Sequence, residues 1–290
     1  METVPLVPVE LERLRRLSTC VVASAIETFR VRLPNAGFAD STIRCIFEDR
    51  PSVAGYAATA RIRTSNPPME GRGYYYERTD WWKHILSIPT PRIVVIEDVD
   101  RPAGRGAFIG EVNANILLAL GCCGLVTNGA VRDLDEVRPT NFQMFAGSVS
   151  VSHAYAHVFD FGGTIEVGGL EIRPGDLIHG DRHGVQTIPS EIAAKVPAVA
   201  QEILQHRQHL VGLCRSPEFS LDELRKGIEH ADAESRPNPT TNRKFQWIGR
   251  IGNDDAQTNL SNARNLHSTH NLCSHKSVVR LRIEHEGERG

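Results

Sequence analysis

Two short segments of this 290-residue chain combine residue types that can hold a carboxylate and polarise a carbonyl group. The first, Gly110-Glu111-Val112-Asn113, follows a glycine-containing loop and opens a predicted helix. Free backbone N–H groups and the positive helix end favour a carboxylate or a phosphate at such a position. Glycine before a helix is common, so taken alone this segment is more often an ordinary loop-to-helix junction.

The second segment, Asn128–Asp133, follows a strand that is predicted at 124–127. Ligands gather at the carboxyl ends of strands in α/β sheets. Arg132 offers a planar fork for a carboxylate or carbonyl, and Asp133 offers a hard oxygen ligand for Mg²⁺ or Mn²⁺. An adjacent Arg-Asp pair is usually a surface salt bridge. Because one helix and one strand separate Glu111 from Asp133, however, their ends can meet in one pocket.

Hydrophobic periodicity and turn residues predict the elements that must position these segments. Helical spacing between Leu11 and Val22 predicts about two N-terminal helices, with Ser18 or Thr19 as the cap between them. Further helices are predicted at 80–88, 111–120 and 190–213, the last capped by Ser190 with Glu191 in its first turn. Strands are predicted at 53–64, 92–99, 124–127 and 142–149, with short strands around 162–172 and 176–189 and a loop at 104–110. This alternation predicts a mixed α/β layer fold.

The end of the chain differs in composition from the rest. Leu, Ile, Val and Phe make up 10 of the 60 residues in 231–290, which is below the roughly 20% that marks a foldable segment. We therefore predict a first domain over 1–215. Residues 216–290 are predicted to form a C-terminal helix and a mostly disordered tail, with a short strand at most over 277–283.

Charge and composition exclude several classes of protein. Lys plus Arg number 33 against 35 for Asp plus Glu, a net charge of −2, which argues against a generally basic nucleic-acid coat. No run of 18 apolar residues predicts a transmembrane helix, and the first twenty residues lack the apolar core of a signal peptide. The six cysteines show no framework spacing. We expect a cytoplasmic protein without nucleic-acid or membrane partners.

At this point the sequence resembles a known family. Glu111, twenty residues and then Arg132-Asp133 resemble the acidic-X20-Arg-Asp signature of metal-dependent 4-hydroxy-4-methyl-2-oxoglutarate aldolases, whose superfamily includes the regulator of ribonuclease activity A. Supporting stretches are PRIVVIEDV, GEVNANILLALGCCGLVTNGAVRD, FQMFAGSVSV and VGGLEIRPGDLIHGDRHGVQTIP, so the resemblance covers roughly 15–215. It implies a three-layer swivelling β/β/α fold with N-terminal helices and a C-terminal helix. It also implies a homotrimer or homohexamer with the active site at a subunit interface.

The resemblance further implies a role for each residue of the motif. Backbone groups of Gly110–Asn113 would hold the pyruvyl carboxylate, and Arg132 would bind and polarise the pyruvyl oxygen. Asp133 would be the direct ligand of Mg²⁺ or Mn²⁺, which Glu111 would reach through water. Two departures stand out, because many members have an acidic residue at the position of Asn128, and the signature acid is often Asp rather than Glu. Both departures could retune metal affinity or substrate choice.

The chemistry leads to the same expectation from the residues. Breaking a C–C bond beside a 2-oxo acid leaves an enolate, which needs a lysine Schiff base or a divalent metal as electron sink. None of the five lysines lies in 104–133, which favours the metal. A metal-bound water could then act as acid or base. We therefore predict a lyase that acts on a 2-oxo-dicarboxylate. It would either cleave 4-hydroxy-4-methyl-2-oxoglutarate to release pyruvate or decarboxylate oxaloacetate.

A non-catalytic binding protein that regulates a ribonuclease or another partner by contact is the alternative, although such a protein has no need of Arg132 and Asp133.

The other residues that could carry chemistry give weaker evidence of a functional site. Histidines without metal-site spacing are interpreted as structural or interface residues: His153, His157, His179 and His183. A zinc-like set lies in the tail: His267, His270, Cys273 and His275. An aromatic block is assigned to core packing, a subunit contact or a pocket rim: Tyr74, Tyr75, Tyr76, Trp81 and Trp82.

Overall fold

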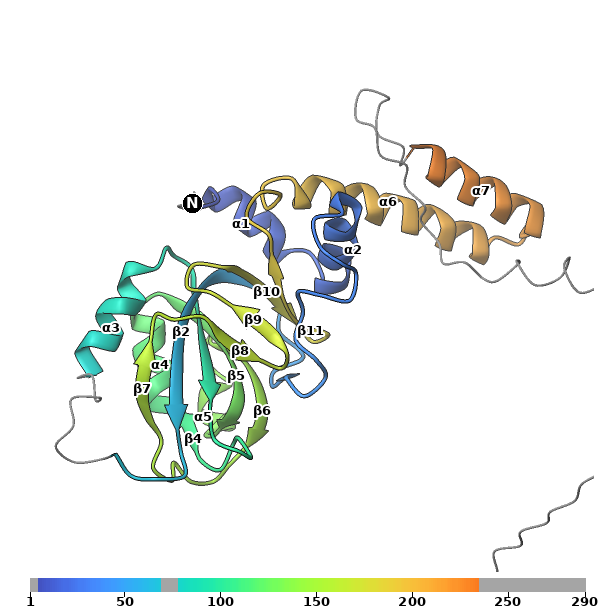
Figure 1. Cartoon of the computed structure of the whole chain (residues 1–290). Coiled ribbons are helices and arrows are strands. Elements are labelled where there is room, and N and C mark those ends of the chain that lie inside the picture. Colours follow the sequence, from blue (N-terminus) through green and yellow to red (C-terminus); the bar gives the residue numbers. More distant parts are fainter. Residues whose placement is uncertain (1–4, 69–77, 235–290) are drawn as a thin grey trace, which may run out of the picture. The chain divides into compact units, whose positions relative to one another are not determined.

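The computed structural model describes residues 5–68 and 78–234 (Figure 1). The helices are α1 (Pro8–Arg15), α2 (Thr19–Phe29), α3 (Arg78–Ser87), α4 (Glu111–Ala119), α5 (Leu134–Val137), α6 (Val196–Arg215) and α7 (Leu221–Glu234). The strands are β1 (Arg44–Cys45), β2 (Val53–Arg63), β3 (Arg92–Asp98), β4 (Ala107–Ile109), β5 (Cys122–Val131), β6 (Gln143–Val149), β7 (His157–Phe161), β8 (Ile165–Val167), β9 (Leu170–Ile172), β10 (Leu177–Asp181) and β11 (Gly184–Ile188). No described helix is both long and apolar enough to cross a membrane.

One nine-stranded sheet organises these elements and curls into a nearly closed, barrel-like layer (Figure 1). Its main path runs β1-β6-β5-β3-β2-β10-β11. The central strands β2, β3, β5 and β6 are parallel, while β1, β10 and β11 add antiparallel edges. Beyond the point where β3 ends, β4 pairs with β5. The carboxyl ends of the parallel strands therefore meet at one edge, where ligand sites of such sheets form.

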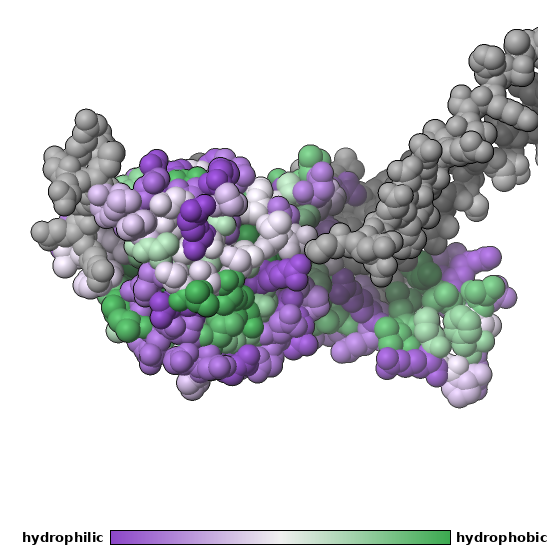
Figure 2. Space-filling view, turned by 90° about the horizontal axis from the view of Figure 1, so that it is seen from below, coloured by the Kyte–Doolittle hydropathy of each residue, from purple (hydrophilic) through white to green (hydrophobic). Residues whose placement is uncertain are grey.

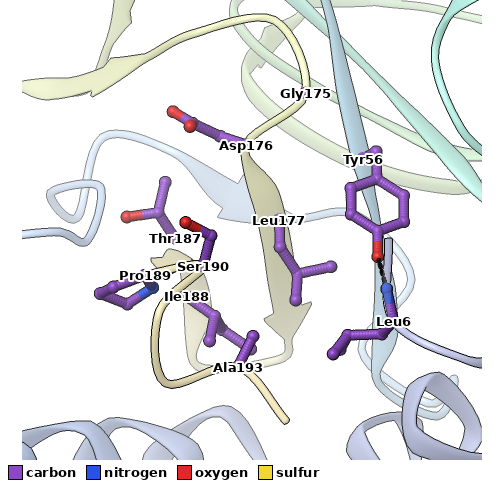
Figure 3. A pocket seen from close by; sticks show the side chains of 10 residues that line it. All are labelled: Leu6, Tyr56, Gly175, Asp176, Leu177, Thr187, Ile188, Pro189, Ser190 and Ala193. Atoms are coloured by element: carbon purple, nitrogen blue, oxygen red, sulfur yellow. Dashed lines mark hydrogen bonds between the residues drawn. The ribbon is translucent and has the colours of Figure 1, made fainter. Parts of the chain in front are cut away.

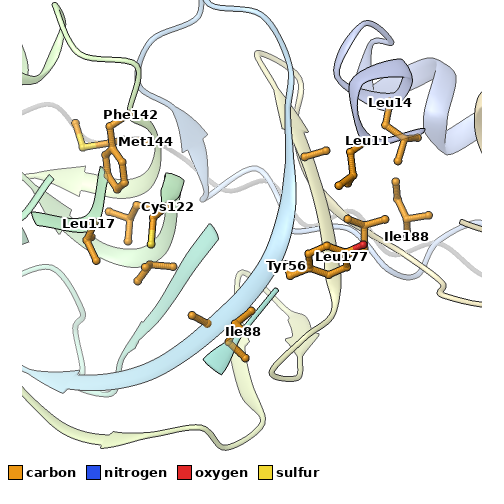
Figure 4. Packing of buried hydrophobic residues seen from close by; sticks show 14 of the residues in the cluster. Leu11, Leu14, Tyr56, Ile88, Leu117, Cys122, Phe142, Met144, Leu177 and Ile188 are labelled. Atoms are coloured by element: carbon orange, nitrogen blue, oxygen red, sulfur yellow. The ribbon is translucent and has the colours of Figure 1, made fainter. Parts of the chain in front are cut away.

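Both faces of the sheet are buried, which accounts for its nearly continuous apolar strands. On β3, Val94 and Ile96 belong to the core cluster on the helical side, whereas Ile93 and Val95 belong to the cluster on the opposite side. That second cluster is closed by the apolar residues of the β8–β9 hairpin. Figure 4 shows part of the first cluster, with Phe142 and Met144 at one end and Leu11 at the other. Helices, sheet and hairpin form three layers, so the expected β/β/α fold class is confirmed.

The N-terminal helices match their prediction. Ser18 is the N-cap of α2, where its Oγ accepts a hydrogen bond from the Val21 N–H at 3.4 Å. The long C-terminal helix, however, does not begin at Ser190. Residues 190–195 form turns, and α6 starts at Val196 with Pro197 in its first turn, where the missing proline N–H costs no helical hydrogen bond. The predicted cap at Ser190, with Glu191 in the first turn, is therefore wrong.

Three strand predictions also need correction. The predicted loop 104–110 contains β4, which is too short to show a period of two. The strand predicted at 124–127 begins at Cys122 and continues to Val131, because β4 pairs with β5 beyond the last residue paired with β3, and β6 pairs with it again after a shift of register between Thr127 and Ala130. Strand β7 has no counterpart in the prediction.

At the C-terminal end, helix α7 extends to Glu234. The predicted strand at 277–283 and the zinc-like cluster lie outside the described residues.

A buried polar network joins the N-terminal helices to the sheet. His179 on β10 is fully buried. Its Nε2 lies 3.0 Å from the Leu14 carbonyl oxygen and its Nδ1 lies 3.1 Å from Thr19 Oγ1. A carbonyl oxygen only accepts, so Nε2 carries the proton and the ring is held neutral. Asp181 accepts from the Thr19 N–H at 2.9 Å and completes the connection.

This network predicts a pH dependence of stability. Burial lowers the pKa of His179 in the folded chain, so the unfolded chain takes up a proton near pH 6.5 that the folded chain refuses. The free energy of unfolding should therefore fall as pH drops below about 6.5. Urea titrations between pH 7.5 and 5.5 should show this slope, and His179→Gln should reduce it. A residual slope is expected from His84, whose pKa burial also lowers. An unchanged slope in the variant would contradict the assignment.

Candidate active site

The two predicted segments meet at the carboxyl edge of the parallel strands. Strand β5 ends at Val131, and strand β4 leads through Gly110 into α4. The Arg132 N–H donates to the Ile109 carbonyl at 3.0 Å, which fastens the end of one strand to the end of the other. Figure 2 looks onto this face of the molecule, where patches of hydrophobic residues lie among polar ones. The helix–strand unit thus closes as the sequence predicts.

The carboxylate of Asp133 is the hub of this closure. Its Oδ1 accepts from Nε of Arg132 at 2.8 Å, and its Oδ2 accepts from the Glu111 N–H at 3.0 Å. Gly110 has no side chain to cap α4, so Asp133 supplies that cap from a distant part of the sequence. The hydrogen bond from Arg132 is the main cause that lowers the pKa of Asp133, helped by the Glu111 N–H and by His153. Asp133 is therefore an anion near neutral pH.

The geometry depends on an unusual backbone conformation at Asp133 and on the absence of a side chain at Gly110. Asp133 has φ 55° and ψ 47°, the left-handed region that few residues other than glycine adopt, although Asp tolerates it better than most. At Gly110, a Cβ atom would overlap Asp133 Oδ2 and would lie 3.0 Å from Cγ of Arg132. Glycine is thus the residue that lets the carboxylate reach the helix N-terminus. A left-handed backbone at a residue other than glycine, as at Asp133, is strain that is typical of functional sites.

Other groups at the edge remain available to a ligand. Within the described part of the chain, no residue occupies the terminal guanidinium nitrogens of Arg132, whose side chain is 29% exposed. The Glu111 side chain is exposed beside it. Asn113 is tied down, because its Nδ2 donates to the Phe108 carbonyl at 2.6 Å, while Val112 is 71% exposed on the same turn. The structure therefore brings together Gly110, Glu111, Arg132 and Asp133, with Val112 and Asn113 on an adjoining surface.

The donor set suits a hydrated hard cation. In residues 5–68 and 78–234, no three His, Cys, Asp or Glu side chains gather as metal ligands, which disfavours a zinc-type cage. Mg²⁺ commonly takes one or two carboxylates and keeps several waters. Each oxygen of Asp133 has one described hydrogen-bond donor, so each retains a lone pair for a cation. Asp133 with Glu111 nearby fits Mg²⁺ or Mn²⁺ of that kind.

A cavity of about 520 Å³ adjoins this edge, between α3, α4, β4 and β7. Its lining is mainly aromatic and aliphatic, and it includes His153 and His157. Nδ1 of His153 lies 3.0 Å from the Ala107 carbonyl oxygen and therefore donates a hydrogen bond to it. His153 also helps to lower the pKa of Asp133, so it lies within electrostatic reach of the carboxylate while it lines the cavity.

These cavity residues were missed or only partly anticipated from sequence. His153 and His157 were interpreted as structural or interface residues, and no spacing signal separates them from His179 and His183, which make structural hydrogen bonds. Trp81 is buried in the core and also lines the cavity, as does the half-buried Trp82. The pocket-rim alternative for the aromatic block therefore suits Trp82. Tyr74, Tyr75 and Tyr76 lie outside the described residues.

Asn128 has a structural role at the same edge. Its Oδ1 accepts from the Asp98 N–H at 2.7 Å, and its Nδ2 donates to the Asp98 carbonyl at 3.0 Å. The amide thereby bridges β3 and β5 where their direct pairing stops. A carboxylate has no N–H to donate, so it could not make both bonds. The departure noted at this position is explained by strand pairing.

A smaller pocket of about 110 Å³ lies away from this edge (Figure 3). The Leu6 N–H donates to Tyr56 Oη at 2.7 Å beside it, and Leu177 and Ile188 supply apolar walls. Asp176 in its lining is occupied by the Arg173 N–H at 2.8 Å. These contacts dock the N-terminal segment on the sheet, and they offer no set of groups aimed at a ligand.

Comparisons with known proteins show which family and which fold the chain resembles. A family model described as RraA-like (Aldolase/RraA) matches residues 19–186. A protein of Halalkalibacterium halodurans named "Putative 4-hydroxy-4-methyl-2-oxoglutarate aldolase" is 34% identical over 101 residues, which are 34% of this chain and 48% of that protein. The matched part is therefore about half the length of that relative.

Two solved structures share the fold. An uncharacterized protein from Pseudomonas syringae pv. tomato superposes with a TM-score of 0.61 at 20% identity, over 78% of this chain and 97% of its own. Streptomyces coelicolor RraAS2, described as an unusual member of the RNase ES inhibitor RraA protein family, gives 0.56 at 17% identity, over 71% and 96%. At these identities the likeness concerns the fold alone.

Gly110→Ala tests the close approach of Asp133 to α4. The new Cβ should push the carboxylate from the Glu111 N–H and lower the free energy of unfolding by about 1–3 kcal/mol, the usual cost of a lost cap with added strain. Gly212→Ala in α6 is the matched control, because a Cβ there meets nothing within 4 Å and should stabilise by about 0.5–1 kcal/mol. Equal changes in the free energy of unfolding for both substitutions, measured by urea unfolding, would count against the contact between Asp133 and the first turn of α4.

Proposed function

The chain belongs to the RraA-like family, and we propose that it is a divalent-metal-dependent carbon–carbon lyase that releases pyruvate from a 2-oxo acid. The observation that carries this proposal is the Asp133 carboxylate held between Arg132 and the first turn of α4. The arrangement keeps one anionic oxygen pair, one guanidinium fork and one helix N-terminus at a single edge. Each is a group that 2-oxo acid chemistry needs. Aldol cleavage of 4-hydroxy-4-methyl-2-oxoglutarate and decarboxylation of oxaloacetate both meet this description.

Different residues of the chain would bind different parts of the substrate. N–H groups of the first turn of α4 would receive the substrate carboxylate, since a helix N-terminus favours an anion. The terminal nitrogens of Arg132 would donate to the 2-oxo oxygen and stabilise the charge that develops on it when the C–C bond breaks. Because Nε of Arg132 is fixed by Asp133, the fork is held in place before substrate arrives. Nε2 of His153 would take or return a proton near the cavity.

Asp133 would hold Mg²⁺ or Mn²⁺ directly and Glu111 through water. Such a cation supplies a Lewis acid that draws electron density from the 2-oxo group. The described lysines offer no competing Schiff base at this edge, because Lys83, Lys195 and Lys226 line neither the edge nor the adjoining cavity. That placement supports metal chemistry over an imine.

We also propose a homotrimer or homohexamer in which a neighbouring subunit completes the site, in keeping with the exposure of Glu111 and Val112 beside it. The five cysteines in the described part of the chain are all unpaired, which supports a reducing cytoplasm as its location. Regulation of a ribonuclease by contact is the alternative. The preorganised Arg132–Asp133 pair favours the lyase, since contact inhibition does not need it.

Three substitutions test the roles of these residues in pyruvate release from oxaloacetate with Mg²⁺ or Mn²⁺. Asp133→Asn should cost most, on the order of 1,000-fold in kcat, because it removes the anionic ligand. Arg132→Lys should cost about 100-fold or more, since a point charge cannot replace the fork. Glu111→Gln should cost about 10- to 100-fold as an outer-sphere group. Asparagine is chosen at 133 because it tolerates the left-handed backbone, which alanine tolerates less well.

Asp135→Asn and Arg138→Lys are matched controls, since both residues are exposed nearby and Arg138 pairs with Asp49 on the surface. Both should keep turnover within about twofold of the wild type. Full activity of Asp133→Asn in the presence of a chelator would refute the metal-dependent lyase. Wild-type protein that releases no pyruvate from any 2-oxo acid would favour the contact regulator.

A further inference from the structure

Resting on the proposed lyase function, we propose that the substrate carries an apolar distal group, aromatic or branched aliphatic, in place of a second carboxylate. The 520 Å³ cavity beside the site would hold this group. Its size falls in the range of about 300–1,000 Å³ that is usual for small-molecule pockets.

The cavity adjoins the proposed catalytic edge through the first turns of α4. Helix α4 belongs to both, because its first N–H is bound to Asp133 while Val112, Asn113 and Ile116 line the cavity. His153 lines the same cavity, and its Nδ1 lies 3.0 Å from the carbonyl oxygen of Ala107 on β4, the strand that leads into α4. A ligand whose carboxylate lies at the helix N-terminus can therefore extend its other end directly into the cavity.

The charges of the cavity argue against a dicarboxylate. None of its described lining residues is Lys, Arg, Asp or Glu, and only two histidines could carry charge there. A second carboxylate would lose its hydration without gaining a guanidinium or ammonium partner, which is costly. A phenyl or branched alkyl group would instead bury against Trp82, Phe108 and Val158, which favours it.

The corresponding reaction is a simple aldol cleavage. In 4-hydroxy-2-oxo-4-phenylbutanoate, the C3–C4 bond breaks, and its electron pair passes to C3 as the enolate of pyruvate. The C4 hydroxyl loses its proton and becomes the carbonyl of benzaldehyde, while C3 gains a proton to give pyruvate. No oxidant or reductant is needed. Nε2 of His153 lies in the cavity lining, where it could accept the hydroxyl proton.

The test compares pyruvate release by the full chain with Mg²⁺ from this substrate, from 4-hydroxy-4-methyl-2-oxoglutarate and from oxaloacetate. We expect kcat/KM for the phenyl substrate to exceed that for the dicarboxylate aldol by about tenfold or more. Trp82→Ala should remove most of this preference, because kcat/KM for the phenyl substrate should fall about tenfold. Phe219→Ala is the control, because Phe219 is a half-exposed aromatic residue outside the cavity lining.

Calorimetric titration with phenylpyruvate and with 2-oxoglutarate gives a second readout that does not depend on turnover. Tighter binding of phenylpyruvate, weakened at least about fivefold by Trp82→Ala and unchanged by Phe219→Ala, supports the ligand class even if no substrate is cleaved. Pyruvate release with equal or better use of the dicarboxylate would overturn the inference and leave the lyase standing. Binding of 2-oxoglutarate as tight as that of phenylpyruvate would overturn it as well.

Discussion

The site depends on one carboxylate, at the end of β5, that caps the helix following the neighbouring strand β4. Asp133 receives a hydrogen bond from the first turn of α4 and another from its own neighbour Arg132. This contact needs a glycine at position 110 and a left-handed backbone at position 133. Removing the side chain would therefore release the helix end, the guanidinium and the proposed cation ligand together. The position of the helix end and the proposed catalytic groups therefore depend on the same two hydrogen bonds.

The sheet makes that contact feasible by changing partners along β5. Its first half pairs with β3, and its last residues pair with β4, which leads directly into α4. Where β5 changes its partner from β3 to β4, the Asn128 side chain bonds both the N–H and the carbonyl oxygen of Asp98. The fold thus carries the end of one strand and the start of one helix to the same edge. It also leaves an apolar cavity beside that helix turn, where the proposed substrate's distal group would lie.

The motif residues and the mixed α/β alternation could be predicted from local signals in the sequence, whereas the order of the three layers is implied by the family resemblance. Val94 and Ile96 alternate with Ile93 and Val95 in a run that is apolar throughout, which is typical of a parallel strand buried on both faces. The helix start at Val196 could not be predicted, because Ser190 and Glu191 form an equally good local cap pattern. The cavity could not be predicted either. Trp82, Phe108 and His153 come from distant segments, and their types fit a core or a surface equally well.

Direct binding of Mn²⁺ to the wild-type chain and to Asp133→Asn tests the central claim most directly. Electron paramagnetic resonance reports free Mn²⁺, and oxalate can stand in for the planar, anionic enolate of pyruvate. The account predicts that the wild type binds Mn²⁺ and that oxalate tightens this binding. It predicts that Asp133→Asn weakens the binding at least about tenfold, whereas the exposed Asp135→Asn leaves it unchanged. Equal Mn²⁺ affinity of the wild type and Asp133→Asn, with or without oxalate, would contradict it.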